Sequence, residues 1–118
     1  MKLKTSELQG AVLDWAVAKC IYEPDDVVIC DGRVFAYDDA TNGFNPSTDW
    51  AQGGPIIERE GMALNMEDTR EWRVSMWWDD EDSKGDILMV GPTPLIAAMR
   101  CYVASQIGDE IELPEEVK

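Results

Sequence analysis

The chain of 118 residues is long enough for one domain with a core of its own. Hydrophobic residues make up 45% and charged residues 29%, which is typical of a globular rather than a disordered protein. Acidic residues outnumber basic ones by 24 to 10, and the net charge of −14 argues against direct binding to nucleic acid or an anionic membrane. The sequence shows neither an apolar run of membrane-spanning length nor a signal peptide, so we expect a cytoplasmic protein.

The first predicted element is a helix over residues 7–21. Ser6 and Gln9 have the spacing of a capping box, and apolar residues recur behind them with a helical period. The helix is expected to end before Pro24, because proline interrupts helical hydrogen bonding.

A hairpin is predicted next. Residues 27–30 and 33–36 are apolar and flank Asp31-Gly32, a dipeptide favoured in tight hairpin turns. The polar, turn-rich segment 37–54 is expected to be an irregular loop, and loops of that length are often functional. Residues 55–58 are expected to start another strand.

A second hairpin is predicted further along the chain. Residues 72–78 alternate apolar and polar side chains, and residues 87–90 supply the partner strand. The acidic run 79–86 between them does not fit a calcium loop, because Lys84 stands at a ligand position. We therefore expect an acidic, solvated turn and no metal site.

The last predicted element is a helix that begins at Thr93 and Pro94 and ends at Gly108. Residues 109–118 are expected to form an acidic C-terminal tail outside a single domain of residues 1–108. The predicted fold class is α+β: an antiparallel sheet of about four to five strands, packed with an N-terminal and a C-terminal helix.

The residues needed for catalysis are scarce. The chain has no histidine, the usual general base near neutral pH, and no nucleophile or phosphate-loop motif. Its three cysteines are expected to be reduced, buried thiols. Glu58 and Glu60 could pair on a strand, although an exposed strand edge is the commoner explanation. We therefore expect a protein that is not an enzyme and carries no cofactor.

The segment around Trp50 has the composition of a binding loop. Trp50 offers a flat face for stacking, while Asp49 and Gln52 could read the edge of a ring. Gly53 and Gly54 would allow close approach of the backbone to a ligand. The alternative is that Trp50 only anchors a long loop to the core.

Groups that favour anions accompany this loop. Thr93 opens a helix whose first N–H groups and dipole favour negative charge, and Arg59 and Arg100 are isolated cations. Each has a simpler explanation, as a helix cap or as a partner of a neighbouring acid. The predicted ligand-binding residues are Ser47, Thr48, Asp49, Trp50, Gln52, Gly53, Gly54, Glu58, Arg59, Thr93 and Arg100.

Three stretches resemble the NinX-like family of small tailed-phage proteins, a domain of unknown function. They are LKTSELQGAVLDWAVAKC, STDWAQGGPIIERE and GPTPLIAAMRCYVASQIGDEIELPEE. Only residues 62–90 depart from the family pattern. The resemblance implies an accessory phage protein acting in the cytoplasm of the infected bacterial host, and it brings no catalytic residues with it.

Two hypotheses of different kinds follow. In the first, a homo-oligomer without catalytic activity binds and sequesters a small nucleotide-like molecule, by analogy with phage proteins that capture host immune signals. In the second, the acidic segments 79–86 and 109–116 form a protein-interaction module or DNA mimic that inhibits a host DNA-binding protein. An unrecognised hydrolase is the third alternative.

Overall fold

The computed structural model describes residues 2–23, 26–30, 33–36, 43–66, 71–79, 81 and 84–113. Within them the chain forms three α-helices, a short 3₁₀-helix and seven short strands. In chain order the elements are β1 (Lys2–Lys4), η1 (Thr5–Glu7), α1 (Gly10–Ile21), β2 (Val27–Cys30), β3 (Arg33–Ala36), α2 (Trp50–Glu60), β4 (Ala63–Met66), β5 (Trp72–Asp79), β6 (Lys84–Gly91), α3 (Pro94–Ile107) and β7 (Glu110–Glu112).

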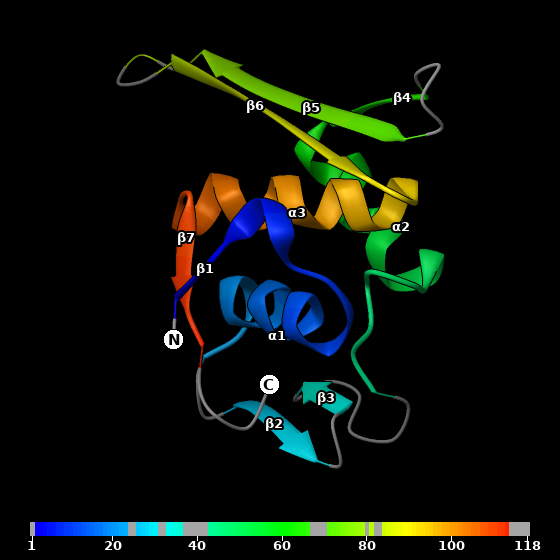
Figure 1. The fold of residues 1–118 in the computed structure, drawn as a ribbon, viewed down its shortest axis with the longest axis vertical. Helices are drawn as coiled ribbons and strands as arrows, with labels where there is room; N and C mark the ends of the chain where they lie inside the picture. Colours follow the sequence, from blue (N-terminus) through cyan, green and yellow to red (C-terminus); the bar gives the residue numbers. More distant parts are fainter. Residues whose placement is uncertain are drawn as a thin grey trace.

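Helix α3 lies at the centre of a layered α+β fold (Figure 1). The antiparallel sheet β4-β5-β6 covers one side of α3, and α1 covers the other. The hairpin β2-β3 packs on the far side of α1, and β1 pairs with β7. The predicted class is confirmed, but the single sheet of four to five strands is wrong. Because helices separate the hairpins, the strands of the described residues form three small antiparallel sheets.

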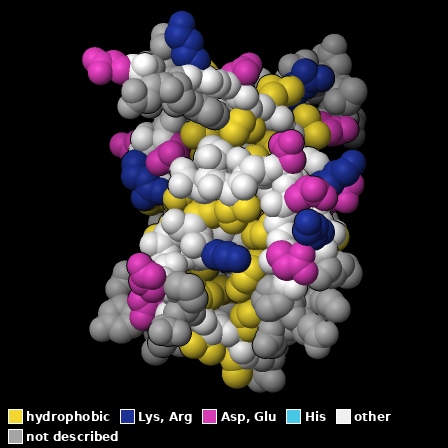
Figure 2. All heavy atoms as spheres, turned by 90° about the vertical axis from the view of Figure 1, so that its left-hand side faces the viewer, with side chains coloured by type: hydrophobic (Ala, Val, Ile, Leu, Met, Phe, Trp, Pro, Cys, Tyr) yellow, Lys and Arg dark blue, Asp and Glu magenta, His cyan; other side chains and the backbone are white. Residues whose placement is uncertain are grey.

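Charged side chains of both signs are spread over the side of the molecule that carries β1 and β7 (Figure 2). Acidic and basic side chains are interspersed there, with apolar side chains visible between them. On this side the excess of acids is therefore not gathered into one uniformly acidic surface.

Helix α1 ends at Ile21 as expected but begins later than predicted. Residues Thr5–Glu7 form the 3₁₀-helix, and Gln9 is the N-cap of α1 without a side-chain capping hydrogen bond. The predicted capping box is therefore wrong. A long-range contact explains the difference: the backbone N–H of Thr5 donates to the carbonyl of Asp109 at 2.8 Å, which ties this segment to the far end of the chain.

Helix α2 replaces a predicted loop and strand. The carboxylate of Asp49 accepts from the N–H of Ala51 at 2.9 Å and caps the helix, which runs through Pro55. A proline inside a helix removes one N–H donor and crowds the carbonyl four residues back, at a cost of about 3 kcal/mol. Ile56 is 4% exposed and packs into the core, and this burial stabilises the helix despite its glycines and proline. The predicted strand at 55–58 is thus wrong, and Glu58 and Glu60 lie on a helix.

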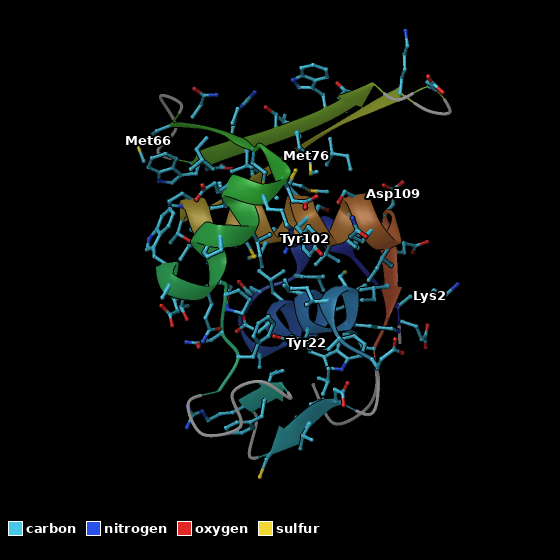
Figure 3. All side chains as sticks on the ribbon, turned by 180° about the vertical axis from the view of Figure 1, so that it is seen from behind. Lys2, Tyr22, Met66, Met76, Tyr102 and Asp109 are labelled. Carbon is cyan, nitrogen blue, oxygen red and sulfur yellow. The ribbon has the colours of Figure 1, made fainter. Side chains whose placement is uncertain are left out.

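The second hairpin is confirmed. β5 pairs with β6 so that Val74 faces Met89, and Val74 and Met76 point into the core. Figure 3 shows Met76 between the sheet and α3. Trp77 lies on the opposite face and is 74% exposed. β4 was not predicted; it adds a third strand to this sheet.

The start and end of α3 are as predicted. The hydroxyl of Thr93 accepts from the N–H of Ile96 at 3.1 Å, Pro94 is the first helical residue, and Gly108 follows the helix with φ of 111°. This helix is buried on almost every side because it lies between the sheet and α1. Its central position makes it the scaffold of the fold.

The remaining predicted features are the first hairpin, the C-terminal tail and the three buried cysteines. The pairing of β2 with β3 is confirmed, while the Asp31-Gly32 turn lies outside the described residues. The segment expected as a tail begins with β7, and Ile111 is 3% exposed. Residues 114–118 lie outside the described part. Cys101 is buried and Cys20 half-buried, but Cys30 is exposed, so the expectation of three buried thiols is wrong.

Candidate functional site

Trp50 lines a cavity that lies between the start of α2 and the start of α3. Trp50 is the first residue of α2 and is 52% exposed. The cavity has a volume of about 220 Å³. Its described lining residues are Ser47, Thr48, Trp50, Thr93, Pro94, Leu95 and Ile96. The structure thus brings four predicted site residues together around this space, which we call the Trp50 cavity.

A hydrogen bond joins the short turn 45–49, which leads into α2, to helix α1. The backbone N–H of Ser47 donates to the Asp14 carboxylate at 2.9 Å, and Asp14 is only 6% exposed. Burial raises the pKa of Asp14, while the N–H and hydroxyl of Ser47 lower it. The Ser47 hydroxyl lies near this carboxylate, yet its Oγ is buried without a partner at hydrogen-bonding geometry.

Ser47 and Thr48 also line a second cavity of about 200 Å³. We call it the Asp14 cavity, and its described lining residues are Gly10, Ala11, Asp14, Arg33, Val34, Gly43, Phe44, Asn45, Ser47 and Thr48. Asp14, Arg33 and Phe44 were missed in the sequence. The available signal was Asp14 itself, an acidic residue set among the apolar residues of the first helix.

Gln52 and the two glycines are engaged within the protein. The side-chain Oε1 of Gln52 accepts from the N–H of Asn45 at 2.6 Å, and its Nε2 donates to the carbonyl of Gly43 at 3.1 Å. Gln52 therefore holds the turn 45–49 in place. Gly53 is buried where α2 meets Pro46 and Leu95, and Gly54 lies beside the Trp50 ring. Asp49 caps α2.

Arg59 lies further along α2, over a third cavity. Its Nε donates to the Glu60 carboxylate at 3.0 Å, and its Nη2 donates to the Tyr102 hydroxyl at 3.4 Å. The hydrogen bond to Glu60 is the main reason that the pKa of Arg59 is raised. The third cavity, of about 270 Å³, is lined by Arg59 together with Gln52, Tyr22 and Phe44, among others. Glu58 is exposed on the same helix.

Arg100 lies in the interior and not at either of the first two cavities. Its Nε donates to the Leu8 carbonyl at 2.7 Å and its Nη1 donates to the Val90 carbonyl at 2.8 Å. Burial lowers the pKa of its guanidinium. Neither Arg100 nor Arg59 is among the described residues that line the Trp50 cavity.

Two further properties bear on the kind of site. Within the described part of the chain, no three His, Cys, Asp or Glu side chains gather in a way that could hold a metal ion. None of the helices described has both the length and the apolar character needed to cross a membrane. The functional groups that line the Trp50 and Asp14 cavities are hydroxyls, a carboxylate, an amide, an arginine, aromatic rings and helix N-termini.

Comparison with known proteins identifies a family. No curated protein matches the chain. The sequence profile of the family described as "Bacteriophage P22, NinX" matches residues 4–106, which covers α1, the turn 45–49, α2 and nearly all of α3. This chain therefore belongs to the phage NinX family, whose function is unknown.

Proposed function

We propose that this protein binds and sequesters a small nucleotide-like molecule without chemically changing it, and that Trp50 stacks on a ring of that molecule. The observation that carries the proposal is the position of Trp50. Its large ring is 52% exposed at the edge of a cavity of about 220 Å³, between two helix N-termini. An aromatic side chain with one face in solvent beside a cavity is suited to stacking on a ligand ring.

Polar groups around the Trp50 ring would orient the bound ligand. The hydroxyls of Thr48 and Thr93 line the cavity. The start of α3 adds the positive end of a helix dipole, which favours a phosphate or another anionic group. Leu95 also lines the cavity, and as an early residue of α3 it has a backbone N–H without an acceptor inside the helix.

The two arginines that were predicted to bind a phosphate, Arg59 and Arg100, differ in whether they can do so. Arg100 is omitted, because two of its nitrogen atoms already donate to interior carbonyls. Arg59 stays a candidate for a long ligand only, since it lines a neighbouring cavity and pairs with Glu60. The net charge of −14 makes a compact ligand with few charges a better match than a polyphosphate.

The family supports a role during infection. For a phage accessory protein, a captured nucleotide is best explained as a host immune signal, and its sequestration would counter that defence. We further propose that the protein acts as a homo-oligomer in the host cytoplasm. Sedimentation of the purified protein measures the oligomeric state directly.

The decisive experiment is recovery of the ligand. The purified protein is incubated with lysate from infected, defence-active cells, washed and heat-denatured, and the supernatant is analysed by mass spectrometry. An intact nucleotide released only on denaturation supports sequestration. A chemically altered product indicates an enzyme, and an empty supernatant beside a co-purifying host protein indicates the acidic interaction module.

A matched pair of variants tests the site. Trp50→Ala should lose the captured molecule, whereas Trp77→Ala should retain it. Trp77 is a suitable control because it is 74% exposed on the outer face of β5 and does not line the Trp50 cavity. Equal recovery from both variants would refute the assignment of the ring to Trp50.

A further inference from the structure

The first turn of α1 forms one wall of the Asp14 cavity, and its first N–H groups have no acceptor among the described residues. Gly10 and Ala11 line the cavity, and the N-cap residue Gln9 offers no side-chain cap. The N–H groups of the first helical residues have no acceptor inside the helix. The N–H of Leu13 is the first to find one, at the carbonyl of Gln9. The N-terminal end of α1 therefore offers backbone N–H groups at the wall of the cavity.

The second wall combines an acceptor with an unpartnered hydroxyl. The Asp14 carboxylate accepts from the N–H of Ser47 at 2.9 Å, which occupies only part of its acceptor capacity. Ser47 is 2% exposed, and its Oγ lies near the Asp14 carboxylate but has no partner at hydrogen-bonding geometry among the described residues. A buried hydroxyl left without a partner is unfavourable, and such exceptions call for an explanation. A polar ligand in the cavity would satisfy both groups.

The remaining walls suit a planar ring. Phe44 lines the cavity and is held edge-on against Tyr22, with ring centroids 5.6 Å apart. Val34 adds an apolar surface, and Arg33 lies beside Gly43. The volume of about 200 Å³ admits one ring system and not a whole nucleotide.

The charged groups of the Asp14 cavity favour a neutral ligand. A bare anion would be repelled by the Asp14 carboxylate, and a bare cation would be repelled by the positive end of α1. A neutral ring with an N–H donor beside a carbonyl acceptor matches both the carboxylate and the helix end. Its N–H would donate to Asp14, and its carbonyl oxygen would accept from the Ser47 hydroxyl and the α1 amides.

We infer that the Asp14 cavity binds the lactam edge of an oxo-purine base, with guanine as the best match. Guanine presents two adjacent N–H donors to the carboxylate and a carbonyl oxygen to the donors. Adenine and cytosine lack the ring N–H beside a carbonyl. The inference rests on the proposed function only for the nucleotide class of the ligand, because its residues are different from Trp50.

Nucleoside titrations test the inference with guanosine, inosine, adenosine and xanthosine as the probes. For the unmodified protein we expect guanosine to bind at least as tightly as inosine, and adenosine to bind more weakly than both. Adenosine binding as tightly as guanosine, or the absence of binding by any of these nucleosides, would overturn the inference.

Asp14→Asn is the informative variant. Asparagine keeps an oxygen for the Ser47 N–H but presents a donor where the second carboxylate oxygen stood. Guanosine affinity should fall about 10- to 100-fold, as expected for loss of a hydrogen bond to a charged group. Xanthosine, which carries a carbonyl in place of the guanine amino group, should bind this variant better than guanosine does. Unchanged guanosine affinity in a folded variant would contradict the inference.

Two more variants test the site. Of these, Trp50→Ala separates the inference from the proposed function, because Ser47 lines both cavities and Trp50 lines only the Trp50 cavity. Ser47→Ala removes only the unpartnered hydroxyl, so it should fold and bind guanosine more weakly; retention of full affinity would count against the site. Trp50→Ala should leave the preference for guanosine over adenosine intact. If Trp50→Ala loses the captured ligand while Asp14→Asn keeps it, the proposed function stands and this inference fails.

Discussion

The guanidinium of Arg100 donates from Nε to the backbone carbonyl of Leu8 at 2.7 Å, across 92 positions of the sequence. A second donor of the same side chain, Nη1, reaches the carbonyl of Val90 at 2.8 Å. Arg100 therefore joins α3 to the turn before α1 and to the end of β6. Its charge therefore serves the fold.

Replacement of Arg100 should destabilise the protein strongly. Each lost hydrogen bond from a charged donor is worth about 1.5–3 kcal/mol, so Arg100→Met should lower the free energy of unfolding by about 2–4 kcal/mol after relaxation. Chemical denaturation measures this change. Arg59→Met is the control, because an exposed ion pair contributes at most about 1 kcal/mol. Equal effects of the two variants would contradict the structural role of Arg100.

The two adjacent glycines of α2 should differ in their tolerance of alanine. A Cβ at Gly53 would lie 2.6 Å from the Cδ2 of Leu95 and against the Pro46 carbonyl, whereas at Gly54 the nearest atom outside the adjacent residues belongs to the Trp50 ring, at 3.8 Å. We expect Gly53→Ala to cost about 1–3 kcal/mol through overpacking. At Gly54 the higher helix propensity of alanine is opposed by contact of its Cβ with the ring of Pro55, so Gly54→Ala should change the stability by less than about 1 kcal/mol. Thermal unfolding of both variants checks the order, and a Gly53→Ala protein as stable as the parent would refute the close packing.

Asp14 should make stability depend on pH in a defined direction. Burial raises its pKa above the ordinary 3.8, so the folded state holds the Asp14 proton more tightly than the unfolded chain does. Its contribution to stability is therefore full below the ordinary pKa and is lost as pH rises through the raised value. The difference in unfolding free energy, parent minus Asp14→Asn, should fall as the pH rises above the ordinary pKa of 3.8. A flat difference would show that the carboxyl is not desolvated.

The cysteines should differ in their reaction with an alkylating reagent. Burial raises the pKa of Cys20 and of Cys101 to about 11, and Cys30 is exposed. Only thiolate reacts at a useful rate, so iodoacetamide at mildly alkaline pH should modify Cys30 first. Mass spectrometry of the native protein should show one modified cysteine, and three after denaturation. Early labelling of Cys101 would contradict its burial, and Cys30→Ser should abolish the native label.

Local patterns were sufficient for the elements that depend on neighbouring residues. The alternation in residues 72–78 predicted β5, because successive side chains of a strand face opposite sides. Thr93, Pro94 and Gly108 predicted both ends of α3, because capping is decided within one turn of a helix. The residues of the hairpin β2-β3 were predicted in the same way.

Burial and long-range contacts decided what local patterns could not. The Gly53-Gly54-Pro55 sequence is unfavourable for a helix, yet α2 forms there because Ile56 enters the core and Gly53 fits against Pro46. The helix α1 starts late because Thr5 is bound to the distant Asp109. Such contacts cannot be read from composition, since they join positions far apart in the chain.

Some features of the candidate site could likewise be predicted from the sequence, and others depend on the tertiary structure. By itself the sequence determined that Trp50 and the Thr93 helix start offer a stacking ring and a helix N-terminus, because these are properties of residue types. Only the tertiary structure decided that these groups share one cavity, that Arg100 turns inward, and that Asp14 meets Ser47 beside a second cavity. The physical reason is that hydrogen-bond partners and burial are set by the packing of α3 between the sheet and α1.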